Sequence, residues 1–107
     1  MSKVKTFIWV DDERPIPKNL MWLGEEKVVC RTYRQAIKAL KIYCCQGNVF
    51  ISLDHDLGQK KTGYDIAKYI VENKIPLYGF VCHSMNPVGR SNIEDLLCHY
   101  GYFLGCK

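Results

Sequence analysis

The sequence predicts a three-layer α/β fold built around a doubly wound parallel sheet. Short apolar segments alternate with segments of helical periodicity, and glycines or prolines separate them. The apolar segments lack the polar–apolar alternation of a half-exposed strand, so we expect their strands to be buried on both faces, as in parallel sheets. Right-handed crossovers between such strands restrict the topology, and the flavodoxin-like strand order 2-1-3-4-5 is the expected one.

The first half of the chain is predicted to hold two strands and one regular helix. The strands are expected over residues 4–10 and 27–31, a turn or two of helix over 18–23, and the regular helix over 33–45. Pro15 and Pro17 prevent a regular helix from beginning earlier, which shortens the first helix of the fold. Thr32 is expected to cap the regular helix and Gly47 to end it.

The second half repeats this alternation and is expected to end on a short fifth strand. The expected elements are strands over 48–53 and 77–82, helices over 64–73 and from Ser91 or Asn92 to about 100, and a strand stub over 102–104. Pro76 and Gly101 separate them. No internal repeat is visible, and 107 residues are the size of one domain, so a single domain over 1–107 is predicted.

The composition excludes several classes of protein. With 48% hydrophobic residues the chain can bury a core, which argues against disorder. No apolar run approaches the roughly 20 residues that span a bilayer, and residues 1–6 lack the apolar stretch of a signal peptide. The net charge of +4 favours an anionic partner only mildly, and no basic stripe with interleaved aromatic residues indicates a long nucleic acid. We expect a cytosolic protein without a membrane partner.

The six cysteines are expected to be reduced thiols. They form no CxxC pair and lack the spacing of a zinc site; they are Cys30, Cys44, Cys45, Cys82, Cys98 and Cys106. Disulfides are the alternative for an even number of cysteines, and they would require export from the cytosol.

Polar residues follow three of the predicted strands. They are Asp11 and Asp12, then Asp54, His55 and Asp56, then His83 and Ser84. Because ligands of such sheets bind beyond the carboxyl ends of the strands, we expect these side chains to share one rim. Four carboxylates so close together call for a hard divalent cation, Mg²⁺ or Mn²⁺, or for raised pKa values. In the alternative interpretation each aspartate merely forms a turn, as Asp12-Glu13-Arg14-Pro15 could.

The histidines and arginines near this rim have more than one interpretation. His55 stands between two acids and is expected to be solvated or to act as a ligand. His83 follows an apolar strand, where a catalytic imidazole and a buried, hydrogen-bonded one are both plausible. Arg90 precedes the predicted last helix and could hold a phosphate at its N-terminus, and Arg14 could do the same; both could equally be solvated.

Three motifs resemble the receiver domains of response regulators. They are Val10-Asp11-Asp12, Ile51-Ser52-Leu53-Asp54 and Thr62-Gly63-Tyr64-Asp65. The resemblance implies that Asp11 and Asp12 bind Mg²⁺ and that Asp54 is at the position of the phosphoryl acceptor. Three features differ from ordinary receivers: His55 and Asp56 stand where apolar residues are usual, no Lys-Pro pair follows the last strand, and Pro15 and Pro17 shorten the first helix.

A divergent group of receivers, the cyclic-phosphate processing receiver domains, resembles the chain more closely. The matching stretches are IWVDDERPIP, ISLDHDLG with TGYDIA, and CHSMNPVGRSNI. The resemblance implies a phosphoesterase for a cyclic phosphate or cyclic nucleotide, in a bacterial cell or its virus-infected counterpart. An RNA end is a further candidate substrate.

These residues suggest a mechanism in which a bound ion activates water. The expected metal ligands are Asp11, Asp12, Asp54 and Asp56; the expected catalytic residues are Asp54, His55 and His83; and the expected substrate-binding residues are Arg14, Ser84, Asn86 and Arg90. His83 would protonate the leaving oxygen and His55 would bind the metal or orient the water. The alternatives are a module that binds a phosphorylated small molecule without turnover and a receiver that is phosphorylated and contacts a protein.

Overall fold

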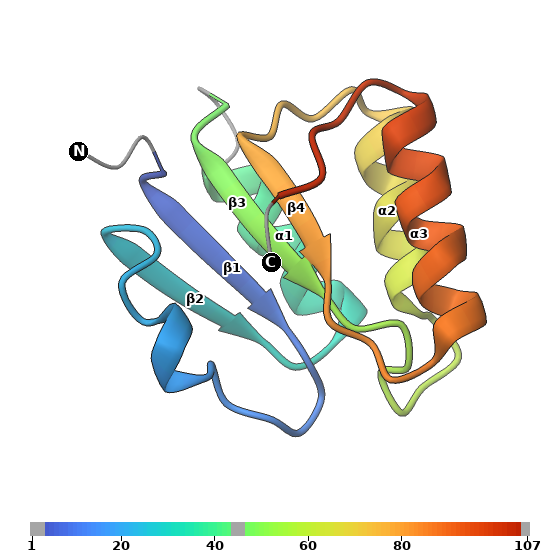
Figure 1. Ribbon diagram of the computed structural model, residues 1–107, viewed down its shortest axis with the longest axis horizontal. Helices are drawn as coiled ribbons and strands as arrows, with labels where there is room; N and C mark the ends of the chain where they lie inside the picture. The colour runs from blue at the N-terminus through green and yellow to red at the C-terminus, as the bar shows by residue number, and fades with distance from the viewer. Residues whose placement is uncertain (1–3, 44–46, 106–107) are drawn as a thin grey trace.

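A four-stranded parallel sheet forms the centre of the computed structural model, which describes residues 4–43 and 47–105 (Figure 1). Its order is β2-β1-β3-β4, with β1 at Thr6–Val10, β2 at Glu26–Cys30, β3 at Val49–Leu53 and β4 at Gly79–Cys82. The predicted α/β class and the order of these four strands are confirmed. The fifth strand is not formed: after β4, the described residues contribute one parallel bridge, between Phe80 and Leu104.

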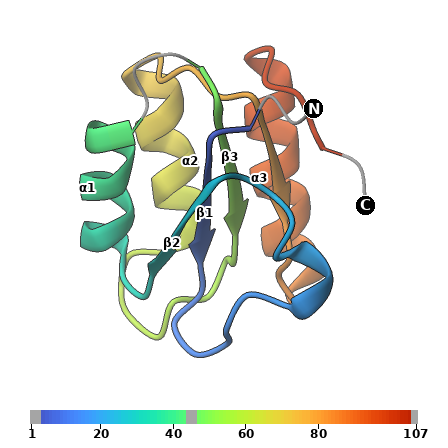
Figure 2. The ribbon, with the colours of Figure 1, turned by 90° about the vertical axis from the view of Figure 1, so that its left-hand side faces the viewer.

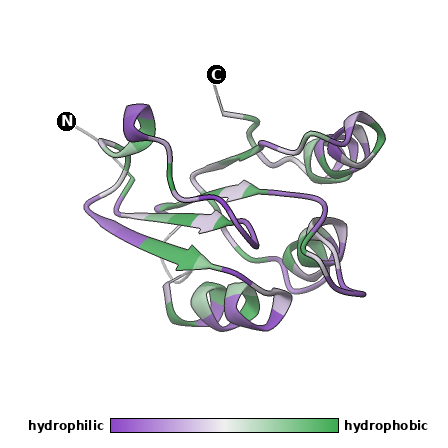
Figure 3. Cartoon of the chain, turned by 90° about the horizontal axis from the view of Figure 1, so that it is seen from below, coloured by the Kyte–Doolittle hydropathy of each residue, from purple (hydrophilic) through white to green (hydrophobic). Residues whose placement is uncertain are grey.

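In the part of the chain that the structure describes, the helices pack on one face of the sheet and a short turn lies on the other (Figures 2 and 3). The helices are α1 at Tyr33–Tyr43, α2 at Gly63–Glu72 and α3 at Pro87–His99, and the turn is η1 at Lys18–Leu20. Successive right-handed crossovers from β2 to β3 to β4 proceed in one direction, so their helices share a face. The step from β1 to β2 proceeds in the opposite direction, which puts η1 on the other face, where Pro15 and Pro17 shorten it as predicted.

The two faces of the sheet have cores of different size. On the helix face, buried residues of all three helices and of the sheet form one cluster, with Ile8, Ile51 and Phe80 fully buried. On the η1 face a smaller cluster consists of Val4, Phe7, Trp9 and Leu23. Val29 and Trp22, by contrast, are exposed. The main core therefore lies between the sheet and the helices.

Side-chain caps fix where the helices begin. The Thr32 hydroxyl accepts a hydrogen bond from the Gln35 amide at 3.1 Å, which confirms the predicted cap of α1. Thr62 and Asp65 form a capping box at the start of α2. The expected start of the last helix at Ser91 or Asn92 was wrong: α3 begins at Pro87, because Asn86 caps it and proline suits a first helical position.

Among the described residues, Cys30, Cys82 and Cys98 are free thiols. Burial raises the pKa of the Cys30 and Cys82 thiols to about 11, so both are protonated at neutral pH. Cys44, Cys45 and Cys106 lie outside the described residues. The last two residues of the helix predicted over 33–45 are therefore not described either. No helix in the described ranges has the length and apolar character needed to cross a membrane.

Candidate functional site

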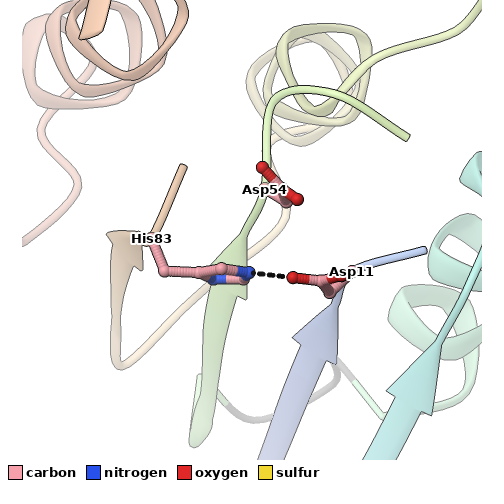
Figure 4. Close-up of side chains that lie close together, drawn as sticks. All are labelled: Asp11, Asp54 and His83. Atoms are coloured by element: carbon pink, nitrogen blue, oxygen red, sulfur yellow. Dashed lines mark hydrogen bonds and ion pairs between the residues drawn. The ribbon is translucent and has the colours of Figure 1, made fainter. Parts of the chain in front are cut away.

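Three polar side chains meet at the carboxyl ends of neighbouring strands (Figure 4). Asp11 follows β1, Asp54 follows β3 and His83 follows β4, and each offers one ligand atom such that all three atoms lie within 4.8 Å of one another. Since parallel strands end at the same edge of a sheet, the order β1-β3-β4 alone brings these three positions together. The predicted rim is therefore present.

Asp11 both forms a turn and faces the cluster. Its Oδ1 atom accepts hydrogen bonds from the amides of Glu13 and Arg14, both at 2.8 Å. Its Oδ2 atom lies 3.0 Å from Nε2 of His83 and 3.2 Å from Nε of Arg14. Burial alone would raise the pKa of Asp11, but the hydrogen bonds from Arg14, Glu13 and His83 hold it below its usual value. The turn-forming interpretation thus describes one carboxylate oxygen, while the other faces His83 and Arg14 in the cluster.

The surroundings of Asp54 disfavour its ionised form, unlike those of Asp11. It is only 7% exposed. Burial raises its pKa, and the charge of Asp11 raises it further, while His83, a hydrogen bond with Ser84 and the charge of Arg14 act in the opposite direction. A cation bound between Asp11 and Asp54 would relieve both unfavourable effects.

Both ring nitrogens of His83 have side-chain partners. Nε2 faces the Asp11 carboxylate, and Nδ1 lies 2.7 Å from the hydroxyl of Ser52. An ionised carboxylate only accepts hydrogen bonds, so in the neutral ring Nε2 carries the proton and Nδ1 accepts one from Ser52. Burial is the main cause that lowers the pKa of His83, which favours this neutral form. The ring also stacks on Trp9, with centroids 3.9 Å apart and planes 7° from parallel.

The backbone of Arg14 is fixed while its side chain is half exposed. Its amide donates to Asp11, and its carbonyl accepts from Nε1 of Trp9 and from the Arg31 guanidinium, both at 2.8 Å. Its side chain is 49% exposed, and its guanidinium lies 3.2 Å from the Asp11 carboxylate and 3.9 Å from that of Asp54. Arg14 can therefore present N–H groups to an anion without a movement of the loop.

A cavity of about 400 Å³ opens at this rim. Besides Asp11, Arg14 and Asp54, it is lined by Asp12, Glu13, Asp56, Gly58 and Met85. Asp12 and Asp56, both predicted metal ligands, thus face the same space as Asp11 and Asp54. They do not belong to the group of Asp11, Asp54 and His83, whose ligand atoms lie within 4.8 Å of one another.

His55 and Asn86 do not line the cavity but contact Asp56 on its wall. His55 bonds Asp56 through Nδ1 at 3.1 Å and packs against Gly89, where a Cβ atom would overlap the imidazole ring. Asn86 contacts Asp56 through its side-chain amide at 3.5 Å, and its backbone amide donates to Ser84. These contacts tie the start of α3 to the loop that follows β3.

Arg90 is placed differently from the expectation. It lies inside α3 and not before it, because the helix begins earlier than predicted. Its side chain is exposed and forms no ion pair or hydrogen bond with the described residues. It also does not line the cavity at Asp54.

Sequence reasoning missed three residues that support the site. Trp9 and Ser52 hold the His83 ring, and Arg31 donates to the carbonyls of Asp11 and Arg14 at 3.1 and 2.8 Å. Arg31 could have been found, because it follows β2, and the carboxyl end of β2 lies at the same rim. Trp9 and Ser52 lie within strands, where no local signal separates them from core residues.

A comparison with family models gives one match. The model described as "Cyclic-phosphate processing Receiver domain" matches residues 6–99, from the start of β1 to the end of α3. No curated protein and no solved structure matches the chain. The family match spans all the described helices and strands and confirms the resemblance noted in the sequence.

Proposed function

The chain belongs to the family of cyclic-phosphate processing receiver domains, and from this premise we propose that it is a metal-dependent phosphoesterase for a cyclic phosphate or cyclic nucleotide. One observation carries the proposal: Asp11 and Asp54 share a buried rim with the half-exposed Arg14 beside both, at the edge of an open cavity. Carboxylates can bind a divalent cation, and a neighbouring guanidinium can bind the phosphoryl oxygens. Together they suit the hydrolysis of a phosphate ester.

Asp11 and Asp54 are the residues that would hold the ion. The raised pKa of Asp54 and the closeness of its carboxylate to that of Asp11 fit a divalent cation. Carboxylate oxygens suit Mg²⁺ and Mn²⁺, and Asp12 and Asp56 on the cavity wall offer further oxygen ligands. Such an ion supplies charge neutralisation at the phosphoryl oxygens and lowers the pKa of water.

Arg14 is the residue that would bind the substrate phosphate. Hydrolysis forms a bond from phosphorus to a water oxygen and breaks one ring P–O bond, and the released oxygen takes up a proton. Negative charge on the phosphoryl oxygens is balanced during this exchange by the N–H groups of Arg14. Its fixed backbone allows the guanidinium to serve without prior ordering of the loop.

His83 is better suited to position Asp11 than to protonate a leaving oxygen. Both of its ring nitrogens already have partners, and burial lowers its pKa, which favours the neutral ring. We therefore assign it the orientation of the Asp11 carboxylate. His55 plays a comparable part for Asp56, which it contacts on the cavity wall. The proton for the leaving oxygen would come from solvent, which reaches the open cavity.

Turnover of defined substrates tests this proposal. Purified protein with Mg²⁺ or Mn²⁺ is incubated with 2′,3′-cyclic nucleotides, 3′,5′-cyclic nucleotides and cyclic dinucleotides, with EDTA as the metal-free control. We expect metal-dependent loss of one substrate class, abolished by Asp54→Asn. If nothing is consumed while a ligand raises the melting temperature, the rim is a binding site and the enzyme proposal fails.

Matched variants separate the roles of the individual residues. Arg14→Gln is expected to lower kcat/KM by about 10²-fold, as loss of a charged contact to the phosphoryl group does. Arg90→Gln, an exposed arginine outside the cavity, is expected to change it little. His83→Gln, which keeps N–H donors, should retain more activity than His83→Ala. Equal losses in the two His83 variants would instead indicate proton transfer by the imidazole.

A second candidate function is phosphorylation of the protein itself. Asp54 follows the inner strand β3 and lies next to Asp11, and the resemblance to receiver domains implies that it is the phosphoryl acceptor. Carboxylates do serve as nucleophiles in phosphoryl transfer. Beryllofluoride with Mg²⁺ distinguishes the two: a stable adduct at Asp54 without any turnover would favour the receiver function.

A further inference from the structure

A basic groove beside the site has no part in the proposed hydrolysis. This α1 groove has a volume of about 530 Å³ and is lined by Arg34, Lys38, Lys41 and Lys61 together with Tyr33 and Gln59. We infer that the α1 groove binds the phosphodiester backbone of a single-stranded oligonucleotide. The inference deepens the proposed function and rests on it in one respect: the end of that chain would be the cyclic phosphate that reaches Asp54.

The charges of the α1 groove are gathered and available. Arg34, Lys38 and Lys41 are spaced by four and then three residues, which puts them on one side of α1. Lys61 joins them from the loop before α2. All four side chains are exposed, and none forms an ion pair with a described residue. No acidic residue of the described ranges lines the groove, so its charge is complementary to a polyanion.

The groove also contains an aromatic ring. The ammonium group of Lys61 lies 5.1 Å from the centroid of the Tyr33 ring, which keeps charge and ring together. Burial raises the pKa of Tyr33, and the charge of Asp65 on α2 contributes further. Asp65 is engaged in the capping box with Thr62 and does not line the groove. A positive groove with a ring that a base can contact is typical of sites for single strands.

The groove and the cavity at Asp54 are joined by one loop. Gly58 lines the cavity, and the next residue, Gln59, lines the groove. The Oε1 atom of Gln59 accepts a hydrogen bond from the Tyr33 amide at 2.9 Å, and this bond connects the loop to the start of α1 (Figure 2). Consecutive Cα atoms are about 3.8 Å apart. The groove and the cavity therefore border the same loop, and a strand bound in the groove would have its end close to the cavity, where the proposed cyclic phosphate is processed. An acidic peptide has no such end group.

Fluorescence anisotropy tests the inference without any catalysis. A labelled single-stranded RNA with a plain 3′ hydroxyl is titrated with full-length protein in EDTA, at several salt concentrations. The test variant is Lys38→Gln/Lys41→Gln, and the matched control is Lys5→Gln/Lys18→Gln, which removes the same charge away from α1. Glutamine has nearly the helix propensity of lysine, so α1 should fold normally.

We expect the test variant to weaken binding about 25-fold at 0.1 M salt, because each lost phosphate contact removes about 0.7 from the salt slope. The control should bind like the unsubstituted protein. Equal weakening of both variants, or no binding at all, would overturn the inference. So would polyglutamate that competes as well as unlabelled RNA, since the groove would then be a site for acidic protein segments.

The outcome is distinguishable from that of the hydrolysis experiment. If the enzyme proposal fails, RNA still binds the α1 groove in EDTA and still depends on Lys38 and Lys41. If the groove inference fails, the Lys38→Gln/Lys41→Gln variant binds RNA no more weakly than the control does, while the unsubstituted protein still turns over a cyclic mononucleotide.

Discussion

The two faces of the sheet are built for different purposes. The helix face buries a continuous apolar cluster that includes residues of α1, α2 and α3. The η1 face has a small cluster, and two of its strand residues, Trp9 and Ser52, hold His83 of the site. Pro15 and Pro17 replace a regular helix by a loop here, and that loop carries Arg14 to Asp11 and Asp54. We infer that stability depends mainly on the helix face and that the η1 face serves the site.

Phe80→Ala should have the largest effect on stability. Phe80 is fully buried in the helix-face cluster, and truncation of a buried phenylalanine destabilises a domain by about 3–5 kcal/mol. Urea denaturation followed by circular dichroism measures this change. A loss below about 1 kcal/mol would mean that the helix face does not dominate stability.

Ser52→Ala should have a smaller effect on stability and a clear effect on the site. It leaves Nδ1 of His83 without its donor, which is expected to reduce stability by about 1–3 kcal/mol. Because His83 orients Asp11, we also expect Mn²⁺ affinity to fall by about 10–100-fold, as for other residues that hold a metal ligand in place.

Calorimetric titration with Mn²⁺ and urea denaturation measure the two effects, and Ser91→Ala on the exposed side of α3 is the matched control. Unchanged Mn²⁺ affinity in Ser52→Ala would show that His83 and its support have no part in metal binding.

Most of the fold and the centre of the site could be predicted from the sequence. The apolar segments identify the strands, and the shared rim of parallel strands brings Asp11, Asp54 and His83 together. The predicted fifth strand is not formed, because the few apolar residues around Leu104 make only one bridge to β4 in the described residues. The start of α3 was misplaced because Ser91 and Asn92 resemble caps as well as Asn86 does.

The support of the site and the basic groove were harder to predict. The strand register decides on which face of β3 the Ser52 side chain lies, and the packing of η1 decides which residues surround it. The α1 groove combines residues 33–41 with residues 59 and 61, so no single stretch of sequence has the basic and aromatic pattern that was sought. Both features arise from contacts between segments that are distant in the chain.

Trp22→Ala should have the smallest effect and bears most directly on the comparison of the two faces. Trp22 follows η1 and is 70% exposed, so its removal is expected to change stability by less than about 0.5 kcal/mol. Urea denaturation gives the stability, and light scattering before and after the substitution gives the oligomeric state. A loss above about 1 kcal/mol, or a dimer that dissociates in the variant, would mean that another molecule covers this face. The η1 face would then contribute to stability through association, and its openness around Arg14 would hold only for the monomer.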